Sequence, residues 1–331
     1  MNDVFVLGAG FSCAVSPAMP ATAGLGEMIA WELQDDPRFA HLVADGGLPD
    51  SDLERWLSRL AERHPFDDPV TYQYNQATFA KVSQAIGRAV RASEHVVLQG
   101  AGPPSWLEAI VDAWDRTQAT LVTFNYDTLV ETTFNSRHGG GSSTRHLALS
   151  PGGMDLWTST YGGGRHDPTT FTLCKLHGSV NWFWQPDGVD RRVIDVGVEE
   201  QWSQFGVPMF DPDLLLERSG TREPFIVPPT SLKGPFFQHD ALRHHWTTAS
   251  RAIAAADRIF VVGYSLPQTD LVAGALLATG VQRKPVTVVN RSPAVVSQRI
   301  DSLALGTARI HEFDGDDAVE RFAVSYADEV A

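Results

Sequence analysis

Three polar side chains of this sequence could take part in bond cleavage: the amide of Asn125, the carboxylate of Asp127 and the imidazole of His177. An amide can orient a water molecule, a neutral imidazole can accept a proton, and a carboxylate favours a developing positive charge. The first two follow the apolar run 119–124, and His177 follows the run 170–176. Both runs are typical of buried strands, and ligands of open α/β sheets bind at the carboxyl ends of strands. We therefore expect the three side chains to share one crevice.

Each of these residues also has an ordinary structural interpretation. An Asn at a strand end is common in turns, and Asp127 could cap the helix that follows it. A single His such as His177 is more often a hydrogen-bonded structural residue than a base. Their expected meeting at one edge of the sheet favours the functional interpretation.

The beginning of the chain adds a glycine-rich turn after the apolar strand predicted at 3–7. Two glycines permit a tight turn and the close approach of a ligand, and we expect the turn to expose amides that bind a pyrophosphate. An ordinary tight turn after a core strand is the alternative. Cys13 stands where the dinucleotide fingerprint of dehydrogenases has its third glycine, which disfavours hydride transfer. The turn consists of Gly8, Ala9, Gly10, Phe11 and Ser12.

Two more turns follow predicted strands in the C-terminal part. Gly263, Tyr264 and Ser265 come after the run 257–262, and Asn290 comes after the run 285–289. The carboxyl ends of parallel strands face the same edge of a sheet. Five turns would then converge on one crevice, as a bound dinucleotide requires.

The elements that must position these residues are clearest near the C-terminus, where strands and helices alternate. This alternation predicts an α/β fold with a doubly wound, parallel, Rossmann-like sheet. The predicted elements are strand 257–262, helix 269–279, strand 285–289, helix 293–304, strand 308–313 and helix 316–327.

Two insertions are expected in a single domain that spans 1–331. Apolar residues at helical spacing predict a helical insert at about 24–116. Alternating segments at 180–184 and 192–196 predict hairpin strands within a small irregular and β insert at about 180–236. The stretch 198–222 has no regular pattern.

Composition excludes several classes of protein. The net charge is −14, and no stretch gathers a basic stripe, so we expect no direct binding to nucleic acid. The chain contains 2 cysteines, too few for a four-cysteine zinc site, and this usage fits a reducing cytoplasm. No apolar run approaches the length of a membrane span, and a histidine group near residue 240 has no metal-site spacing and is expected on an exposed helix face. The histidines are His239, His244 and His245.

Taken together and in order, the motifs resemble the sirtuin family, and more narrowly its bacterial, defence-associated branch. Individually each motif is short, but the ordered set is specific. The segments Pro-Pro-Thr (228–230) and Lys233 are also similar to that branch. The motifs are Gly-Ala-Gly-Phe-Ser (8–12), Thr-Phe-Asn-Tyr-Asp (123–127), Lys-Leu-His-Gly-Ser (175–179), Gly-Tyr-Ser-Leu-Pro (263–267) with Asp270, and Val-Val-Asn (288–290).

This resemblance implies an NAD-binding domain that cleaves the bond between nicotinamide and ribose. It implies that the glycine turn with Ser12 holds the pyrophosphate, and that Asn125 and Asp127 line the pocket of the nicotinamide ribose. His177 would be a neutral general base that titrates near the operating pH. The adenosine half would be held by Gly263, Ser265 and Asn290.

The sequence departs from deacylating sirtuins, which carry a zinc module built from four cysteines. Water is then the expected acceptor, and the expected activity is that of an NAD glycohydrolase that uses no metal and depletes NAD during phage infection. Such an enzyme needs a gate, so we expect a homo-oligomer or a regulatory partner protein. The alternatives are a deacylase or ADP-ribosyltransferase, and a sensor subunit that binds NAD or ADP-ribose without catalysis.

Overall fold

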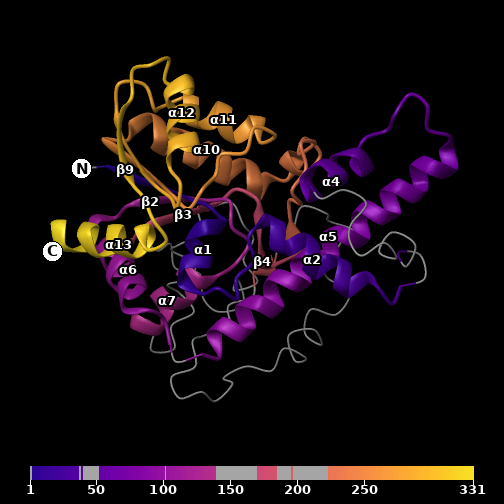
Figure 1. Ribbon diagram of the computed structural model, residues 1–331, viewed down its shortest axis with the longest axis horizontal. Helices are drawn as coiled ribbons and strands as arrows, with labels where there is room; N and C mark the ends of the chain where they lie inside the picture. The colour runs from indigo at the N-terminus through magenta and orange to yellow at the C-terminus, as the bar shows by residue number, and fades with distance from the viewer. Residues whose placement is uncertain are drawn as a thin grey trace.

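A six-stranded parallel sheet forms the centre of the molecule (Figure 1). The computed structural model describes residues 2–36, 39, 52–100, 102–138, 170–184, 195–196 and 223–331, so the stretch 198–222 lies outside the described residues. The predicted α/β, doubly wound, Rossmann-like sheet is confirmed. From edge to edge its strands are β3 (Thr172–Lys175), β2 (Thr120–Thr123), β1 (Asp3–Leu7), β7 (Arg258–Val262), β8 (Pro285–Val289) and β9 (Arg309–Phe313).

Helices cover both faces of this sheet, which explains why the central strands are continuous apolar runs. In β1, Phe5 and Leu7 point into one hydrophobic cluster, whereas Val4 and Val6 point into another. The first cluster is covered by α1 (Ala9–Val15), α6 (Ser105–Thr117), α7 (Leu129–His138) and α13 (Ala318–Glu329). The second is covered by α10 (Asp240–Ala255), α11 (Leu271–Ala278) and α12 (Ala294–Leu303).

The strand order places a topological switch point between β1 and β7. From β1 the chain continues to β2 and β3 on one side, and it returns through β7 to β8 and β9 on the other side. The loops after β1 and β7 therefore leave in different directions, and the crevice between them is where sheets of this order bind dinucleotides.

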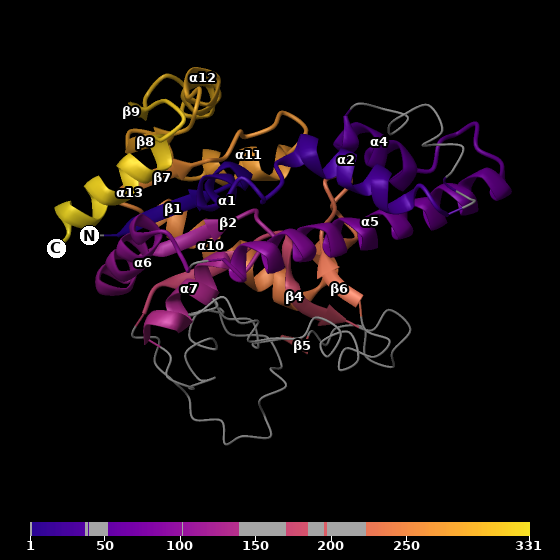
Figure 2. The same ribbon diagram turned by 60° about the horizontal axis from the view of Figure 1, so that its bottom comes forward.

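Between β1 and β2 the chain forms helices that extend beyond the sheet: α2 (Thr22–Leu33), α4 (Leu53–Ala61) and α5 (Pro69–Leu98), the longest of them (Figures 1 and 2). Two aspartates fix where helices begin. The side chain of Asp52 accepts the Arg55 amide, and that of Asp68 accepts the amides of Val70 and Thr71. Such capping compensates amides that have no partner within the first turn.

A second, antiparallel sheet confirms the predicted β excursion. It consists of β4 (Gly178–Trp184) between β5 (Asp195–Val196) and β6 (Glu223–Ile226), and a short helix η2 (Phe236–Gln238) follows. Gly178 has a φ of +76°, and a Cβ there would lie 2.2 Å from the Phe225 carbonyl oxygen. The chain thus bends sharply from the main sheet into β4, and this bend leaves His177 at the junction of the two sheets.

Among the helices of the described residues, none has the length and apolar character that a membrane crossing needs.

Candidate functional site

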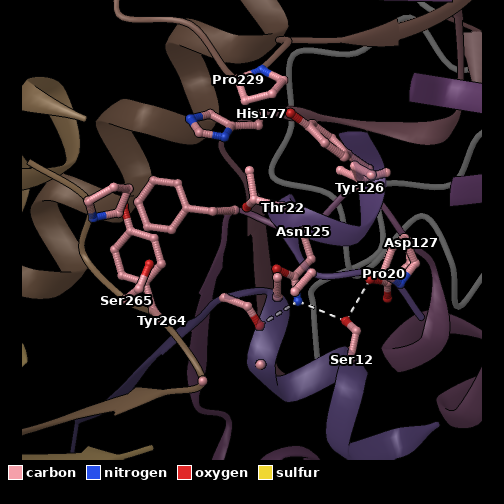
Figure 3. A pocket seen from close by; sticks show the side chains of 18 of the residues that line it. Ser12, Pro20, Thr22, Asn125, Tyr126, Asp127, His177, Pro229, Tyr264 and Ser265 are labelled. Carbon is pink, nitrogen blue, oxygen red and sulfur yellow. Dashed lines mark hydrogen bonds between the residues drawn. The ribbon is translucent and has the colours of Figure 1, made fainter. Parts of the chain in front are cut away.

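A cavity of about 310 Å³ lies at the carboxyl edge of the main sheet, at the switch point (Figure 3). The predicted convergence of the strand-end turns is confirmed, because residues of all five turns line this cavity. Phe11 is the exception: its ring is buried in the core and packs edge-on against Trp106 at 5.8 Å. The predicted residues in the lining are Gly8, Ala9, Gly10, Ser12, Asn125, Asp127, His177, Gly263, Ser265 and Asn290.

The loops after β1 and β7 pack so closely against each other that glycine is required at their contact. A Cβ on Gly8 would lie 2.5 Å from the Tyr264 Cα, and one on Gly10 would lie 2.8 Å from the Gly263 carbonyl oxygen. Gly263 itself has a φ of +62°, in the left-handed region that side chains disfavour. These glycines therefore bring the two loops into backbone contact.

The expectation that the turn exposes its amides is largely wrong. The amide of Gly8 donates to the Val262 carbonyl at 3.1 Å, and that of Gly10 donates to Gly263 at 2.8 Å. The Phe11 amide donates to the Gly8 carbonyl at 2.9 Å. Within 8–11, only Ala9 has an amide for which the described residues provide no acceptor.

Asn125 is held in one orientation by two hydrogen bonds. Its Nδ2 donates to the Gly8 carbonyl and to the Ser12 hydroxyl, both at 2.9 Å. Because a carbonyl oxygen can only accept, the amide nitrogen must lie on that side. The Oδ1 atom of Asn125 is then left as an acceptor that faces the cavity (Figure 3).

Asp127 continues this network below the cavity. The Ser12 hydroxyl donates to its Oδ2 at 2.6 Å, and its Oδ1 accepts the Leu129 amide at 3.3 Å. The helix-capping interpretation of Asp127 therefore holds alongside a place in the cavity wall. Burial raises the pKa of Asp127, although the charge of Lys175 and the Ser12 hydroxyl oppose that shift. Lys175 is itself buried and paired with Glu131 at 2.8 Å.

His177 lies across the cavity from Asn125 (Figure 3). Its ring is buried and packs edge-on against Phe124 at 5.1 Å. Burial, reinforced by the charge of Lys233 and opposed by Asp270, lowers the pKa of His177 to about 3. The imidazole is therefore neutral at physiological pH, as predicted, but the expectation that it titrates near the operating pH is wrong. Its Nε2 is buried and has no hydrogen-bond partner in the described part of the chain.

Three charged groups beside His177 received no role from sequence reasoning. Lys233 and Asp270 form a buried ion pair at 2.8 Å, and both line the cavity. Glu54 reaches the cavity from α4, where burial raises its pKa against a hydrogen bond from Thr269. No local pattern distinguishes Glu54, since the apolar spacing in α4 leaves it among the polar positions.

Of the two histidines in α10, His244 is exposed as expected and His245 is not. His245 is buried rather than exposed, and its Nδ1 accepts the Lys175 backbone amide at 2.9 Å. The exposed-helix interpretation is therefore wrong for this residue. Across the described ranges, no group of three or more His, Cys, Asp or Glu side chains is arranged to hold a metal ion.

No protein-family model matches this chain, and no curated protein does. Solved structures of Sir2 proteins are similar to it. One comes from work on the mechanism and regulation of Sir2 enzymes. It is 13% identical to this chain with a TM-score of 0.46, and the match covers 99% of this chain and 91% of that chain. A Sir2 homologue in complex with NAD is 13% identical to this chain and has a TM-score of 0.46. The match covers 100% of this chain and 91% of the homologue. A variant of a Sir2 homologue in complex with ADP-ribose is 14% identical and has a TM-score of 0.45. The match covers 99% of this chain and 92% of the variant.

Proposed function

We propose that the cavity binds NAD and cleaves the bond between nicotinamide and ribose, with water as the acceptor. The products would be nicotinamide and ADP-ribose. One observation carries this proposal: the amide of Asn125 and the neutral imidazole of His177 line one cavity at the switch point of a sheet with dinucleotide-binding strand order.

The cavity walls suit the two halves of a dinucleotide. The ADP half would lie along the loops after β7 and β8, where Ser265 and Asn290 offer polar groups next to Gly263. The pyrophosphate would lie against the turn after β1, where the Ala9 amide is available. The nicotinamide ribose would then lie between Asn125 and His177.

Cleavage of the bond between nicotinamide and ribose needs no general acid to protonate the leaving group. Nicotinamide leaves a cationic pyridinium as a neutral molecule, so the site must stabilise an oxocarbenium-like ribose and deliver an acceptor to its C1′ atom. In our proposal the Oδ1 atom of Asn125 accepts a hydrogen bond from the attacking water. Asp127 favours the developing positive charge, and the neutral ring of His177 accepts a proton from a ribose hydroxyl.

Water is the proposed acceptor because the chain lacks the cysteines for a zinc module of the deacylating type. Its 2 cysteines are Cys13 in α1 and Cys174, buried in β3. A deacylase or ADP-ribosyltransferase would require an acylated peptide or another acceptor for turnover. Release of free ADP-ribose from NAD alone supports hydrolysis.

The decisive experiment incubates the purified chain with NAD and quantifies nicotinamide by chromatography. We expect Asn125→Ala and His177→Ala each to lower the rate by about 100-fold or more, because each removes a group that acts on the reacting atoms. His311→Ala, which removes an exposed histidine of β9, is the matched control and should retain the wild-type rate.

The low pKa of His177 makes it a weak base, and this observation favours one rival, a sensor that binds NAD without cleaving it. The sensor would bind NAD stoichiometrically and release no nicotinamide, and the two variants would change binding only. Calorimetric titration with NAD beside the rate measurement separates the two functions.

We further propose that the activity serves defence against phage by depleting NAD, and that oligomerisation or a regulatory partner gates it. An ungated enzyme of this kind would kill its host. The rate per chain should therefore rise with protein concentration or on addition of the partner. A dilute monomer with the full rate per chain would contradict the gate.

A further inference from the structure

The two nitrogens of His177 have different surroundings. Nε2 is enclosed and has no hydrogen-bond partner within the described ranges, whereas the ring lines the cavity on the side of Nδ1 (Figure 3). The polar atom that Nε2 faces is Oδ2 of Asp270, at 3.6 Å. This separation exceeds a hydrogen bond, but catalytic contacts are often long in an empty site and shorten when a ligand binds.

Asp270 is fixed from several directions. It precedes α11, and its Oδ1 caps that helix by accepting the Ala273 amide at 3.3 Å. Its Oδ2 accepts from Lys233 at 2.8 Å and from the Tyr264 hydroxyl at 3.4 Å. Burial works against its ionisation, but His177, Lys233 and the Ala273 amide together lower the pKa of Asp270, so it is a carboxylate.

A carboxylate can only accept hydrogen bonds, and this fixes the proton on the ring. The neutral imidazole must then carry its hydrogen on Nε2, toward Asp270. The lone pair on Nδ1 is left facing the cavity. We propose that Asp270, itself held by Lys233, is a positioning residue that keeps His177 in the Nε2–H form, so that Nδ1 can accept a proton from a hydroxyl of the bound ribose.

The proton balance of this step is closed. The O–H bond of the ribose hydroxyl breaks, its proton moves to Nδ1, and the ring becomes an imidazolium whose Nε2–H donates to Asp270. The oxygen of the attacking water forms the new bond to C1′ as the bond to nicotinamide breaks, and this water returns one proton to the ribose oxygen. The proton on Nδ1 passes to bulk water after the products leave, so one proton is released in each turnover. Asp270 thus stabilises the positive charge of the imidazolium when it forms. Lys233 keeps the ring of His177 neutral before the proton is transferred. Such an arrangement, in which a third group orients the base, recurs in nucleophilic catalysis.

The other titratable groups around the pair come from different elements. Glu54 of α4 lies beside Lys233 and Asp270, and the phenols of Tyr126 and Tyr264 complete the surroundings. Burial raises the pKa of both phenols, so they stay neutral. Lys233 and Glu54 are therefore the charges to control when Asp270 is changed.

This inference depends on the proposed function, and the test keeps the two apart. In Asp270→Asn the side-chain oxygen can still cap α11, which places Nδ2 opposite the ring. Nε2 must then accept, and the hydrogen moves to Nδ1. Nitrogen-15 NMR of the side chain, assigned by comparison with His177→Ala, should show the Nε2–H form in the wild type and the Nδ1–H form in the variant.

The same variant should lower kcat for nicotinamide release by about 10-fold to 100-fold and leave KM within about twofold, because the base is lost and not the binding surface. Asp68→Asn, which changes the helix-capping aspartate of α5, is the matched control for both measurements. An Nδ1–H form in the wild type, or the same form in both proteins, overturns the proposal. An Nε2–H wild type that releases no nicotinamide overturns the proposed function alone.

Lys233→Met provides a second measurement if Asp270→Asn fails to fold. Removing the ammonium removes one cause of the low pKa of His177 and leaves the carboxylate in place. The NMR titration should show a higher pKa for His177, with the Nε2–H form retained below it. An unchanged pKa overturns the proposed link from Lys233 through Asp270 to the ring.

Discussion

The hydroxyl of Ser12 connects the two polar residues that follow β2. It accepts from Asn125 at 2.9 Å and donates to Asp127 at 2.6 Å, and it is 3% exposed. The resemblance assigned this residue to the pyrophosphate, and that role stays a prediction. Its hydrogen bonds give it a second task, which is to hold the amide of Asn125 with Oδ1 toward the cavity.

Ser12→Ala separates these two tasks. If Ser12 positions Asn125, the variant should lower kcat by about 10-fold to 100-fold. A hydrogen bond to a charged or catalytic group contributes about 1.5–3 kcal/mol, and its loss lowers the rate by about this factor. The Kd for NAD, measured by titration calorimetry, should change by less than about threefold. Ser302→Ala on the exposed face of α12 is the control. A large rise in Kd with kcat unchanged would assign Ser12 to the pyrophosphate instead.

At the scale of elements, the cavity depends on how closely the loop after β1 approaches the loop after β7. A Cβ on Gly263 would lie 2.1 Å from the Phe11 amide nitrogen, so no side chain fits between the loops. The contact joins α1 to the second half of the sheet and sets the width of the crevice. The insert acts at the same scale, since α4 carries Glu54 to the other side of the cavity.

Gly263→Ala tests this loop contact. We expect the free energy of unfolding to fall by about 1–2 kcal/mol from the left-handed backbone alone, with a further loss from the collision. Urea unfolding followed by circular dichroism measures the change. Gly274→Ala in α11 is the matched control, because a Cβ there meets nothing within 4 Å and alanine favours the helix. Equal stability of the two variants would show that the loops are not in contact.

At the scale of the whole molecule, buried neutral histidines link folding to pH. Burial is the largest cause that lowers the pKa of both His177 and His245 to about 3. Each group binds a proton in the unfolded chain below pH 6.5 and remains neutral in the folded chain. The unfolded state then binds more protons, so the free energy of unfolding falls as the pH drops from 6.5 toward 3.

His245→Asn tests this linkage away from the cavity, because its Oδ1 can still accept the Lys175 amide that His245 accepts. Between pH 7.5 and 5.5 one such histidine accounts for a loss of about 1.4 kcal/mol in the free energy of unfolding. Urea unfolding at the two pH values measures the loss in the free energy of unfolding. This loss should be smaller in His245→Asn than in the wild type by about that amount. An identical loss in both proteins would mean that His245 ionises within the folded chain.

Local patterns were enough to predict the fold and the strand-end turns that line the cavity. Apolar runs ending in Asn125 or His177 predict buried strands, and parallel strands bring their carboxyl ends to one edge. Asn125 and His177 are therefore expected at the same edge of the sheet, and they lie close together because β2 and β3 are neighbours. The glycines of the first turn were also evident, although the reason for them was not, since their contact with residue 263 joins segments that are far apart in sequence.

The parallel sheet and the edge at which polar residues gather follow from the amino-acid sequence, because the periodicity of burial is a local property of the chain. The charges and the proton positions at that edge depend on how distant segments pack in the folded molecule. Residues 54, 177, 233 and 270 come from four separate segments, and the pKa of His177 depends on its burial and on the nearby charges of Lys233 and Asp270. The folded structure likewise supplies acceptors for two amides of the glycine turn, because Gly8 donates to Val262 of β7 and Gly10 donates to Gly263 in the loop after it.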